Sequence, residues 1–510
     1  MTLSFKSLLT AALLIATPVG AQTVHTAQGD VTSTPAGPVT AWLGLPYAAP
    51  PVGANRWRAP QPASAWTGVR AADHFAANCQ QNLSGGLGPW TSEYEPHGAV
   101  SEDCLYLNIW APPVHSKPLP VMVWIHGGAF TAGSGSVSIY NGSALAQDGI
   151  IVVTINYRVG VYGFLASPDL TREAGTSGNY GLLDQIAALQ WVHDNIAAFG
   201  GDPAHVTIAG QSAGAASIHD LMISPLAKGL FQQAIAESGS GLNPGPGDFA
   251  TAEYHGTALA TAAGVTGLDA LRQLTPEALA AAAAKSKADG VSQSFAPVID
   301  GRVLPSASEI ADVPVLTGMT ANEDSYMSFF APGIITPEAY TAEVNNRFGA
   351  LAADILRLYP AATTAASRDA LQRDGELAGM DGWATTYGLH AHAPVFAYLW
   401  THAEPGPEAA RYGAFHSSEI SYVFRTFAAS DRPYSDADHA LSDTISHYWV
   451  NFVKTGDPNA TGLPSWPAYT PAQPVIEEIG DRPGARPILP PATLDLLRRH
   501  LAAGGVVGRI

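Results

Sequence analysis

Short apolar runs alternate with longer amphipathic segments along much of the chain. Residues 121–126 (VMVWIH) and 150–157 (IIVVTINY) are continuous and rich in β-branched side chains, which is typical of strands buried on both faces. Residues 184–199 (DQIAALQWVHDNIAAF) have the spacing of an amphipathic helix, and Gly200 follows it. Residues 205–209 (HVTIA) predict the next strand. Strand, helix and strand in this order indicate a crossover unit of a mostly parallel sheet covered by helices.

The second half of the chain is less regular but carries the same kinds of element. Residues 241–390 contain Ala-rich helical patterns such as 279–284, and we expect helices here that cap the sheet and shape a pocket. Strand patterns return at residues 313–318 and 394–400. No linker or charge block divides the chain, and 46% of its 510 residues are hydrophobic. We therefore expect one large α/β domain over residues 22–510.

The first 21 residues have the pattern of an export signal. They carry one charge, on Lys6, then an apolar run at residues 8–16, and then Val19-Gly20-Ala21. Small residues at these last positions predict cleavage after Ala21 and a secreted or periplasmic protein. The apolar run is too short to span a bilayer, and no later run approaches about 20 residues, so membrane insertion is not expected.

Charge and cysteine content narrow the function classes further. The formal net charge is −18 at pH 7, which argues against nucleic acid or an anionic membrane surface as a partner. The two cysteines, Cys79 and Cys104, flank a Gly-rich segment. In an exported chain, a disulfide that closes this loop is favoured over two free thiols.

The segment Gly210-Gln211-Ser212-Ala213-Gly214 lies between a predicted strand and a predicted helix. This is the context of a G-x-S-x-G nucleophile elbow, a turn so tight that its flanking positions accept almost no side chain. The turn presents the serine oxygen at the tip of the strand. A Gly-rich turn with a solvated serine is the alternative, since the chain has 51 glycines. The strand and helix on either side favour Ser212 as a nucleophile.

A second glycine-containing segment, residues 126–130 (HGGAF), also follows a predicted strand. Small residues at such a turn let consecutive backbone N–H groups point at one bound oxygen, which is how an oxyanion hole is built. Gly128 and Ala129, with Ala213 after the nucleophile, are the expected donors. An ordinary turn would be the alternative for this segment alone, but the elbow beside it favours the oxyanion hole.

At these motifs the chain resembles the type B carboxylesterase and cholinesterase family, which has the α/β-hydrolase fold, over essentially its whole mature length. Seven ordered strings carry the resemblance: SEDCLYLNIW at 101–110, HGGAF at 126–130, NYRVGVYGFL at 156–165, GNYGLLDQ at 178–185, FGGDP at 199–203, GQSAG at 210–214 and NFVKTGDPN at 451–459. The resemblance implies a large mostly parallel twisted sheet flanked by helices, with helical cap insertions.

The resemblance also supplies the other two members of a catalytic triad. A G-x-x-x-x-E segment at residues 318–323 places the acid at Glu323, with the neighbouring Asp324 as the fallback. An H-x-x-E segment at residues 416–419 makes His416 the base. The order Ser, acid, His is the order expected for this fold.

These residue types meet the needs of ester hydrolysis. A serine hydroxyl is a weak nucleophile, so an imidazole must take its proton and a carboxylate must hold that imidazole in the right tautomer. No metal or organic cofactor is required. His390 and His392 invite a metal-site interpretation, but without a third ligand we interpret them as structural. The family further pairs Cys79 with Cys104 and suggests an ion pair between Arg56 and Glu102.

Substrate preference depends on positions where the chain departs from the family. The residue before the nucleophile is commonly glutamate and here it is Gln211, so we expect that cationic esters are not favoured. Glu419 is expected near Gln211, sharing water-mediated contacts. Val291 and Gln293 stand where cholinesterases carry the aromatic rings of a tight acyl pocket, so a larger acyl group is expected to fit.

The alcohol side of the pocket is less defined. Trp90 or Tyr94, in the loop between the cysteines, could line it, or could simply pack at the surface. The favoured function is a serine carboxylesterase acting on small neutral or apolar esters, as a monomer or weak homo-oligomer. A lactonase, amidase or toxin-ester detoxifying hydrolase would use the same triad. A non-catalytic adhesion or binding member of the fold is disfavoured, because such members typically lose a triad residue.

Overall fold

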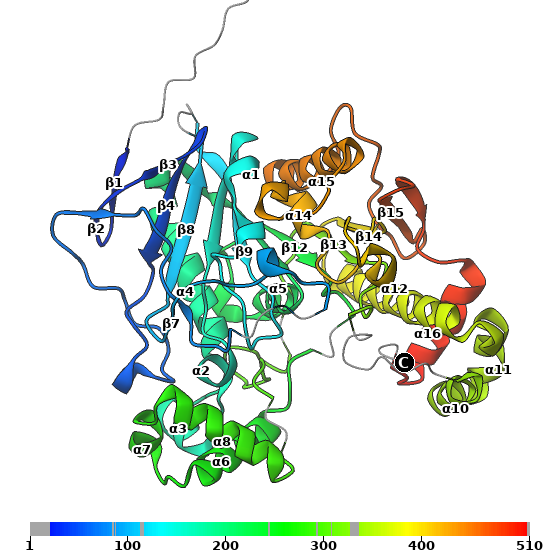
Figure 1. The fold of residues 1–510 in the computed structure, drawn as a ribbon, viewed down its shortest axis with the longest axis horizontal. Coiled ribbons are helices and arrows are strands. Elements are labelled where there is room, and N and C mark those ends of the chain that lie inside the picture. The colour runs from blue at the N-terminus through cyan, green and yellow to red at the C-terminus, as the bar shows by residue number, and fades with distance from the viewer. Residues whose placement is uncertain are drawn as a thin grey trace, which may run out of the picture.

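The computed structural model of the chain is built around one 11-stranded mixed sheet (Figure 1). From one edge to the other its strands are β16 (Gly484–Pro487), β15 (Val475–Ile479), β14 (Val395–Trp400), β13 (Val315–Thr320), β12 (Gln233–Glu237), β11 (Gly201–Gln211), β9 (Leu119–Ile125), β10 (Ile151–Ile155), β8 (Tyr106–Ala111), β4 (Val39–Pro46) and β3 (Thr34–Ala36). The strands from β15 to β10 run parallel, and the outer pairs are antiparallel. The predicted α/β-hydrolase sheet is confirmed.

The structure describes most of the chain. The described residues are 21–83, 86, 88–112, 117–242, 245–291, 294–307, 309–326 and 336–506. The expected export signal, except for Ala21, and the acyl-pocket candidate Gln293 lie outside these residues.

Helices cover the sheet and extend beyond it at two ends (Figure 1). Those beside the central strands are α1 (Ser143–Gln147), α2 (Gly160–Phe164), α4 (Tyr180–Asn195), α5 (Ala213–Ile223), α14 (Ile420–Val423) and α15 (Asp436–Thr455). One outer group contains α3 (Pro168–Ala174), α6 (Phe249–Ala263), α7 (Leu268–Arg272) and α8 (Pro276–Ala288). The other contains α10 (Pro337–Phe348), α11 (Ala352–Leu358), α12 (Thr364–His390) and α16 (Pro491–Ala502); α13 (Ala409–Tyr412) is a short turn before α14.

The core lies on both faces of the sheet, and β9 contributes to each. Val121, Val123 and Ile125 belong to one buried cluster, whereas Met122 and Trp124 belong to the other. Successive side chains of a strand point to opposite faces, so a strand covered on both sides must be apolar at every position. This is why the continuous apolar run in the sequence predicted a central strand.

The helix predicted at residues 184–199 forms with different bounds. α4 covers Tyr180–Asn195, and a 3₁₀ turn follows at Ile196–Phe199. Its first turns bury the polar side chains of Asp184 and Gln185. Both are paired: Asp184 accepts hydrogen bonds from the Arg158 guanidinium, and Gln185 donates to the Ser217 hydroxyl at 3.0 Å. Buried but paired polar residues obscure the apolar pattern from which a helix start is predicted.

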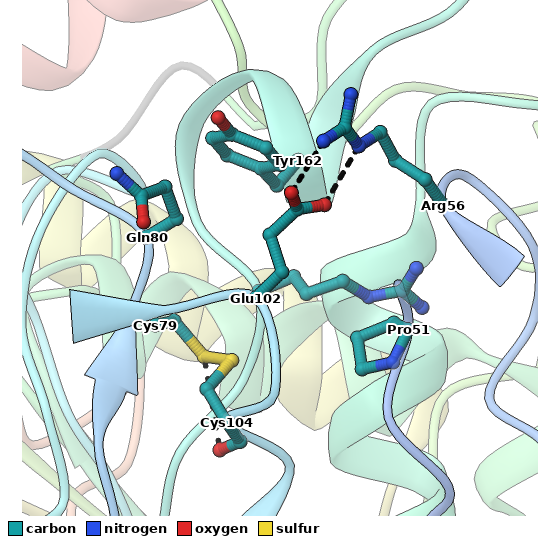
Figure 2. Close-up of a pocket in the computed structure, with 8 residues that line it drawn as sticks. Pro51, Arg56, Cys79, Gln80, Glu102, Cys104 and Tyr162 are labelled. Carbon is teal, nitrogen blue, oxygen red and sulfur yellow. Dashed lines mark hydrogen bonds and ion pairs between the residues drawn. A yellow bond between two sulfur atoms is a disulfide. The ribbon is translucent and has the colours of Figure 1, made fainter. Parts of the chain in front are cut away.

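The predicted disulfide between Cys79 and Cys104 is confirmed, as is the ion pair between Arg56 and Glu102 (Figure 2). Nε of Arg56 donates to Oε2 of Glu102 at 2.7 Å, and Nη2 bonds to the other carboxylate oxygen. Both residues and both cysteines line a small hollow that also touches Tyr162. The two crosslinks fix the base of the loop that lies between the cysteines.

Two short sheets complete the N-terminal part. One contains β1 (Thr23–Thr26), β2 (Gly29–Thr32) and β5 (Val69–Ala71), and the other contains β6 (Asn78–Cys79) and β7 (Val100–Ser101). Within the described ranges, no helix has both the length and the apolar character needed to cross a bilayer.

Candidate active site

Ser212 lies at a sharp turn between β11 and α5, as the elbow motif predicts. Its backbone has φ 58° and ψ −121°, a conformation that L-residues rarely adopt. A side chain on Gly214 would place its Cβ 2.0 Å from the carbonyl oxygen of Ile125, so that position must be glycine. Ala213 is the first residue of α5, and the N–H of a first helical residue has no carbonyl partner within the helix.

The turn at residues 126–130 packs directly against this elbow. A Cβ on Gly127 would lie 2.8 Å from the carbonyl oxygen of Gln211 and 3.1 Å from Cβ of Ser212. Gly128 and Ala129 follow with φ of 109° and 54°. The chain thus brings the two motifs together, and the backbone of the predicted oxyanion segment passes beside the serine.

The predicted acid and base are in contact with each other. Nδ1 of His416 and Oε2 of Glu323 form a short hydrogen-bonded ion pair. The other carboxylate oxygen of Glu323 accepts hydrogen bonds from the Ser238 hydroxyl at 2.6 Å and the Thr320 backbone N–H at 2.7 Å. Three hydrogen bonds hold the Glu323 carboxylate in place. Through its bond to Nδ1, that carboxylate fixes the orientation of the His416 ring.

The charges of this pair support each other. Burial alone would raise the pKa of Glu323, but the attraction and hydrogen bond of His416, with the donors on the other oxygen, lower it below the usual value. For His416, burial lowers the pKa, yet the Glu323 carboxylate beside it outweighs burial and raises the pKa overall. Glu323 therefore stays ionised at neutral pH, and the imidazole is a stronger base than an ordinary histidine.

The side-chain amide of Gln211 lies beside the imidazole of His416. Its nitrogen is 3.2 Å from Nε2 and 3.5 Å from Nδ1 of the ring. Among the described residues, Ser212 makes no side-chain hydrogen bond to this ring, although it follows Gln211 directly in the chain. Catalytic hydrogen bonds of this kind often tighten only when substrate is bound.

Two further carboxyl groups are buried behind the triad. Glu419 accepts a hydrogen bond from the Tyr398 hydroxyl at 3.2 Å, and Glu237 accepts one from the Trp449 indole N–H at 2.7 Å. Burial raises the pKa of Glu237 to about 8 and that of Glu419 well above its usual range, so burial favours the neutral form of both carboxyl groups. The water-mediated contact of Glu419 with Gln211 stays a prediction.

The remaining pocket candidates take different places. The indole N–H of Trp90 donates to the main-chain carbonyl of His416 at 3.0 Å, so Trp90 lies at the site. The ring of Tyr94 packs against Phe415 with centroids 5.8 Å apart. Val291 follows α8, and its N–H bonds to the carbonyl of Ser286. Whether these residues touch substrate stays a prediction.

Sequence reasoning missed several residues that shape this site. Glu237 is the last residue of β12 and Ser238 follows it, beside β13, after which Glu323 comes. A polar pair at the carboxyl end of a buried strand was the available signal. Tyr326, whose ring lies 4.9 Å from that of Trp90, gave no local signal. Arg432, whose guanidinium bonds to Pro89 and Thr91 on both sides of Trp90, gave no local sequence signal either.

The described residues contain no group of three or more His, Cys, Asp or Glu side chains arranged to hold a metal ion. His390 is the last residue of α12, and Nδ1 of His392 lies 3.3 Å from Asp312.

Comparison with known proteins identifies the family of the chain. A model of the carboxylesterase family matches residues 20–488. The chain belongs to the carboxylesterase family. A relative named fumonisin B1 esterase, from Sphingopyxis macrogoltabida, is 38% identical over 487 residues, covering 89% of this chain and 87% of the relative. The para-nitrobenzyl esterase of Bacillus subtilis (strain 168) is 38% identical, covering 88% and 92%.

Solved structures give the same result for this carboxylesterase. A PNB esterase structure matches with a TM-score of 0.81 at 35% identity, covering 93% of this chain and 99% of that one. A thermophilic PNB esterase matches with a TM-score of 0.80, also at 35% identity and with the same coverage. The fold is that of the α/β-hydrolases, and the protein is a serine carboxylic-ester hydrolase.

Proposed function

We propose that Ser212, His416 and Glu323 form the catalytic triad of this esterase. The contact between His416 and Glu323 carries the proposal, because it joins two residues 93 positions apart in the sequence in the arrangement that general-base catalysis needs. The strained backbone of Ser212 at a strand-to-helix turn supports its role as nucleophile.

The reaction begins when Oγ of Ser212 attacks the ester carbonyl and Nε2 of His416 takes the serine proton. The carbonyl oxygen gains negative charge and accepts hydrogen bonds from the N–H groups of Gly128, Ala129 and Ala213, each lowering the barrier by about 3 kcal/mol. The alcohol leaves with the proton from His416. Water then attacks the acyl-enzyme by the same steps, and the acid is released.

We infer that the substrate is a neutral or apolar carboxylic ester. The carboxylate of Glu323 and the carboxyl of Asp324 both act on His416, and negative charge at this position disfavours an anionic substrate. The uncharged Gln211 amide takes the place of the carboxylate common in cholinesterases, which weakens attraction for a cation. An uncharged ester fits both conditions.

A toxin ester is a second candidate substrate. The fumonisin B1 esterase named above supports it, since that relative is 38% identical over most of both chains. Lactone or amide cleavage by the same triad has no comparable support. A neutral aryl or alkyl ester remains the first candidate because the para-nitrobenzyl esterase relative covers a similar share of the chain.

A panel of p-nitrophenyl esters of graded acyl length tests this substrate class. We expect measurable kcat/KM for neutral acyl chains and a marked loss when the acyl group carries a carboxylate. Ser212→Ala is the matched control for background hydrolysis. A preference for the anionic ester over its neutral match of equal size would contradict the proposed class.

We also propose that residues 1–21 direct export and that the mature protein acts in a secreted or periplasmic compartment. The disulfide between Cys79 and Cys104 supports this, because such bonds persist in oxidising compartments. The mature enzyme is proposed to be a monomer or weak homo-oligomer. N-terminal sequencing of the exported protein should begin at Gln22, and light scattering should report the mass of one or a few chains.

A further inference from the structure

Arg432 lies between α14 and α15 and contacts the segment that carries Trp90. Its guanidinium donates to the carbonyl oxygen of Pro89 at 3.0 Å and to the hydroxyl of Thr91 at 2.7 Å. Its Nε donates to Oε1 of Glu93 at 2.9 Å. One side chain therefore bonds to positions on both sides of Trp90.

The same guanidinium has a second carboxylate partner. Nε of Arg432 lies 3.3 Å from a carboxylate oxygen of Glu404, whose side chain is fully buried. Glu404 also accepts a hydrogen bond from the Tyr94 hydroxyl at 3.0 Å. The guanidinium carbon lies 5.9 Å from the ring centre of Phe415, the residue before His416. A planar fork with several donors suits such a site, and a lysine could not make all these bonds.

Trp90 connects this cluster to the catalytic histidine. Its indole N–H donates to the main-chain carbonyl of His416 at 3.0 Å, and the two rings meet edge-on with centroids 6.3 Å apart. The indole also contacts the ring of Tyr326. The main chain at position 416 is thus held by a hydrogen bond whose donor depends on the segment that Arg432 anchors.

We propose that Arg432 is a positioning residue for His416, acting through the segment 89–93 and the hydrogen bond from Trp90. The inference rests on the proposed role of His416 as the catalytic base. Without the guanidinium, Glu93 and Glu404 lose the cation between them and the segment is released. The His416 imidazole then samples more orientations, and even a small misalignment of Nε2 with the serine hydroxyl reduces the rate of proton transfer. A small ester makes few contacts with the alcohol side of the pocket, where Trp90 is a candidate, so the loss is expected mainly in kcat.

Four variants test this inference: Arg432→Met, Trp90→Phe, the double variant and Arg498→Met. Arg498 is the matched control, since it also pairs with a buried carboxylate, Asp381, but does so between α12 and α16. We expect each single change at 432 or 90 to lower kcat for p-nitrophenyl acetate about tenfold, with little change in KM. The double variant should be no slower than the slower single variant, because both changes break one chain of contacts. Arg498→Met should keep the kcat of the unmodified enzyme.

The outcomes separate this inference from the proposed function. Failure of a fluorophosphonate to label folded unmodified enzyme at Ser212 overturns the proposed function and, with it, the role of Arg432. A labelled enzyme in which Arg432→Met keeps full kcat, or in which the two losses multiply, overturns the inference alone. Melting curves show whether each variant is folded. If Arg432→Met is unfolded, Glu93→Gln, which weakens only one of the bonds, replaces it under the same criteria.

Discussion

The side-chain amide nitrogen of Gln211 lies 3.2 Å from Nε2 of His416. Because Nδ1 of the same ring is bonded to Glu323, a neutral imidazole carries its lone pair on Nε2. The amide nitrogen is also 3.5 Å from Nδ1, so it lies beside the ring and off the direction of that lone pair. Attack by Ser212 requires that same lone pair. Gln211 therefore contacts the imidazole without lying where the Ser212 hydroxyl must bond to Nε2.

Replacing this amide with a carboxylate should change both substrate choice and pH dependence. In Gln211→Glu, a negative charge beside His416 should favour the imidazolium and raise its pKa, so activity should be lost at a higher pH than in the unmodified enzyme. The ratio of kcat/KM for matched cationic and neutral esters should rise. Steady-state kinetics on such an ester pair measures it. An unchanged ratio would show that Gln211 does not influence substrate charge.

Activity should fall as His416 becomes protonated. Only the neutral imidazole accepts the serine proton, and the Glu323 carboxylate raises the pKa of His416. The acid side of the kcat/KM profile should therefore have its midpoint above about 6.5, the ordinary value for histidine. Initial rates from pH 5 to 9, with recovery checked at pH 8, provide the measurement. A flat profile between pH 8 and 5 is incompatible with His416 as the base.

The carboxylate of Glu323 should be essential, although it does not touch substrate. Glu323→Gln keeps the shape but allows the wrong imidazole tautomer, so kcat should fall by about 10⁴ by analogy with other triads. Asp324→Asn is the control, because it alters the neighbouring carboxyl and should have a far smaller effect. If Asp324→Asn causes the larger loss, the acid of the triad must be reassigned.

The disulfide should contribute to global stability. Cys79 and Cys104 are 25 residues apart, and removing a crosslink of this loop length should lower the free energy of unfolding by about 3 kcal/mol. Urea unfolding of the Cys79→Ser/Cys104→Ser double variant measures this, and unmodified enzyme in reductant is the comparison. A loss below about 1 kcal/mol would mean that other contacts, such as the Arg56–Glu102 pair, already hold the loop.

The central strands could be predicted because both faces of the sheet are covered. The apolar run at residues 121–126 became β9, and the run at 150–157 became β10, each within a few residues. The start of α4 could not be predicted as well. Asp184 and Gln185 are buried there with partners from distant elements, and a sequence pattern treats such residues as solvent-facing.

The residues of the site also differ in how well the sequence predicts them. Ser212 could be predicted locally, because the elbow needs its glycines within five residues. Glu323 and His416 came from the family resemblance, since they lie far from Ser212 along the chain. Arg432 could not be predicted, because its partner Glu93 is 339 positions away and a lone arginine has no local pattern. Folding alone creates that contact.

Covalent labelling of the nucleophile tests the central claim most directly. The enzyme is treated with a fluorophosphonate, digested, and analysed by mass spectrometry beside Ser212→Ala. A reactive triad predicts one adduct on the peptide containing Ser212 and none on the variant. A folded enzyme that remains unlabelled, or that carries its adduct on another residue, would contradict the assignment of Ser212, His416 and Glu323 as the catalytic triad.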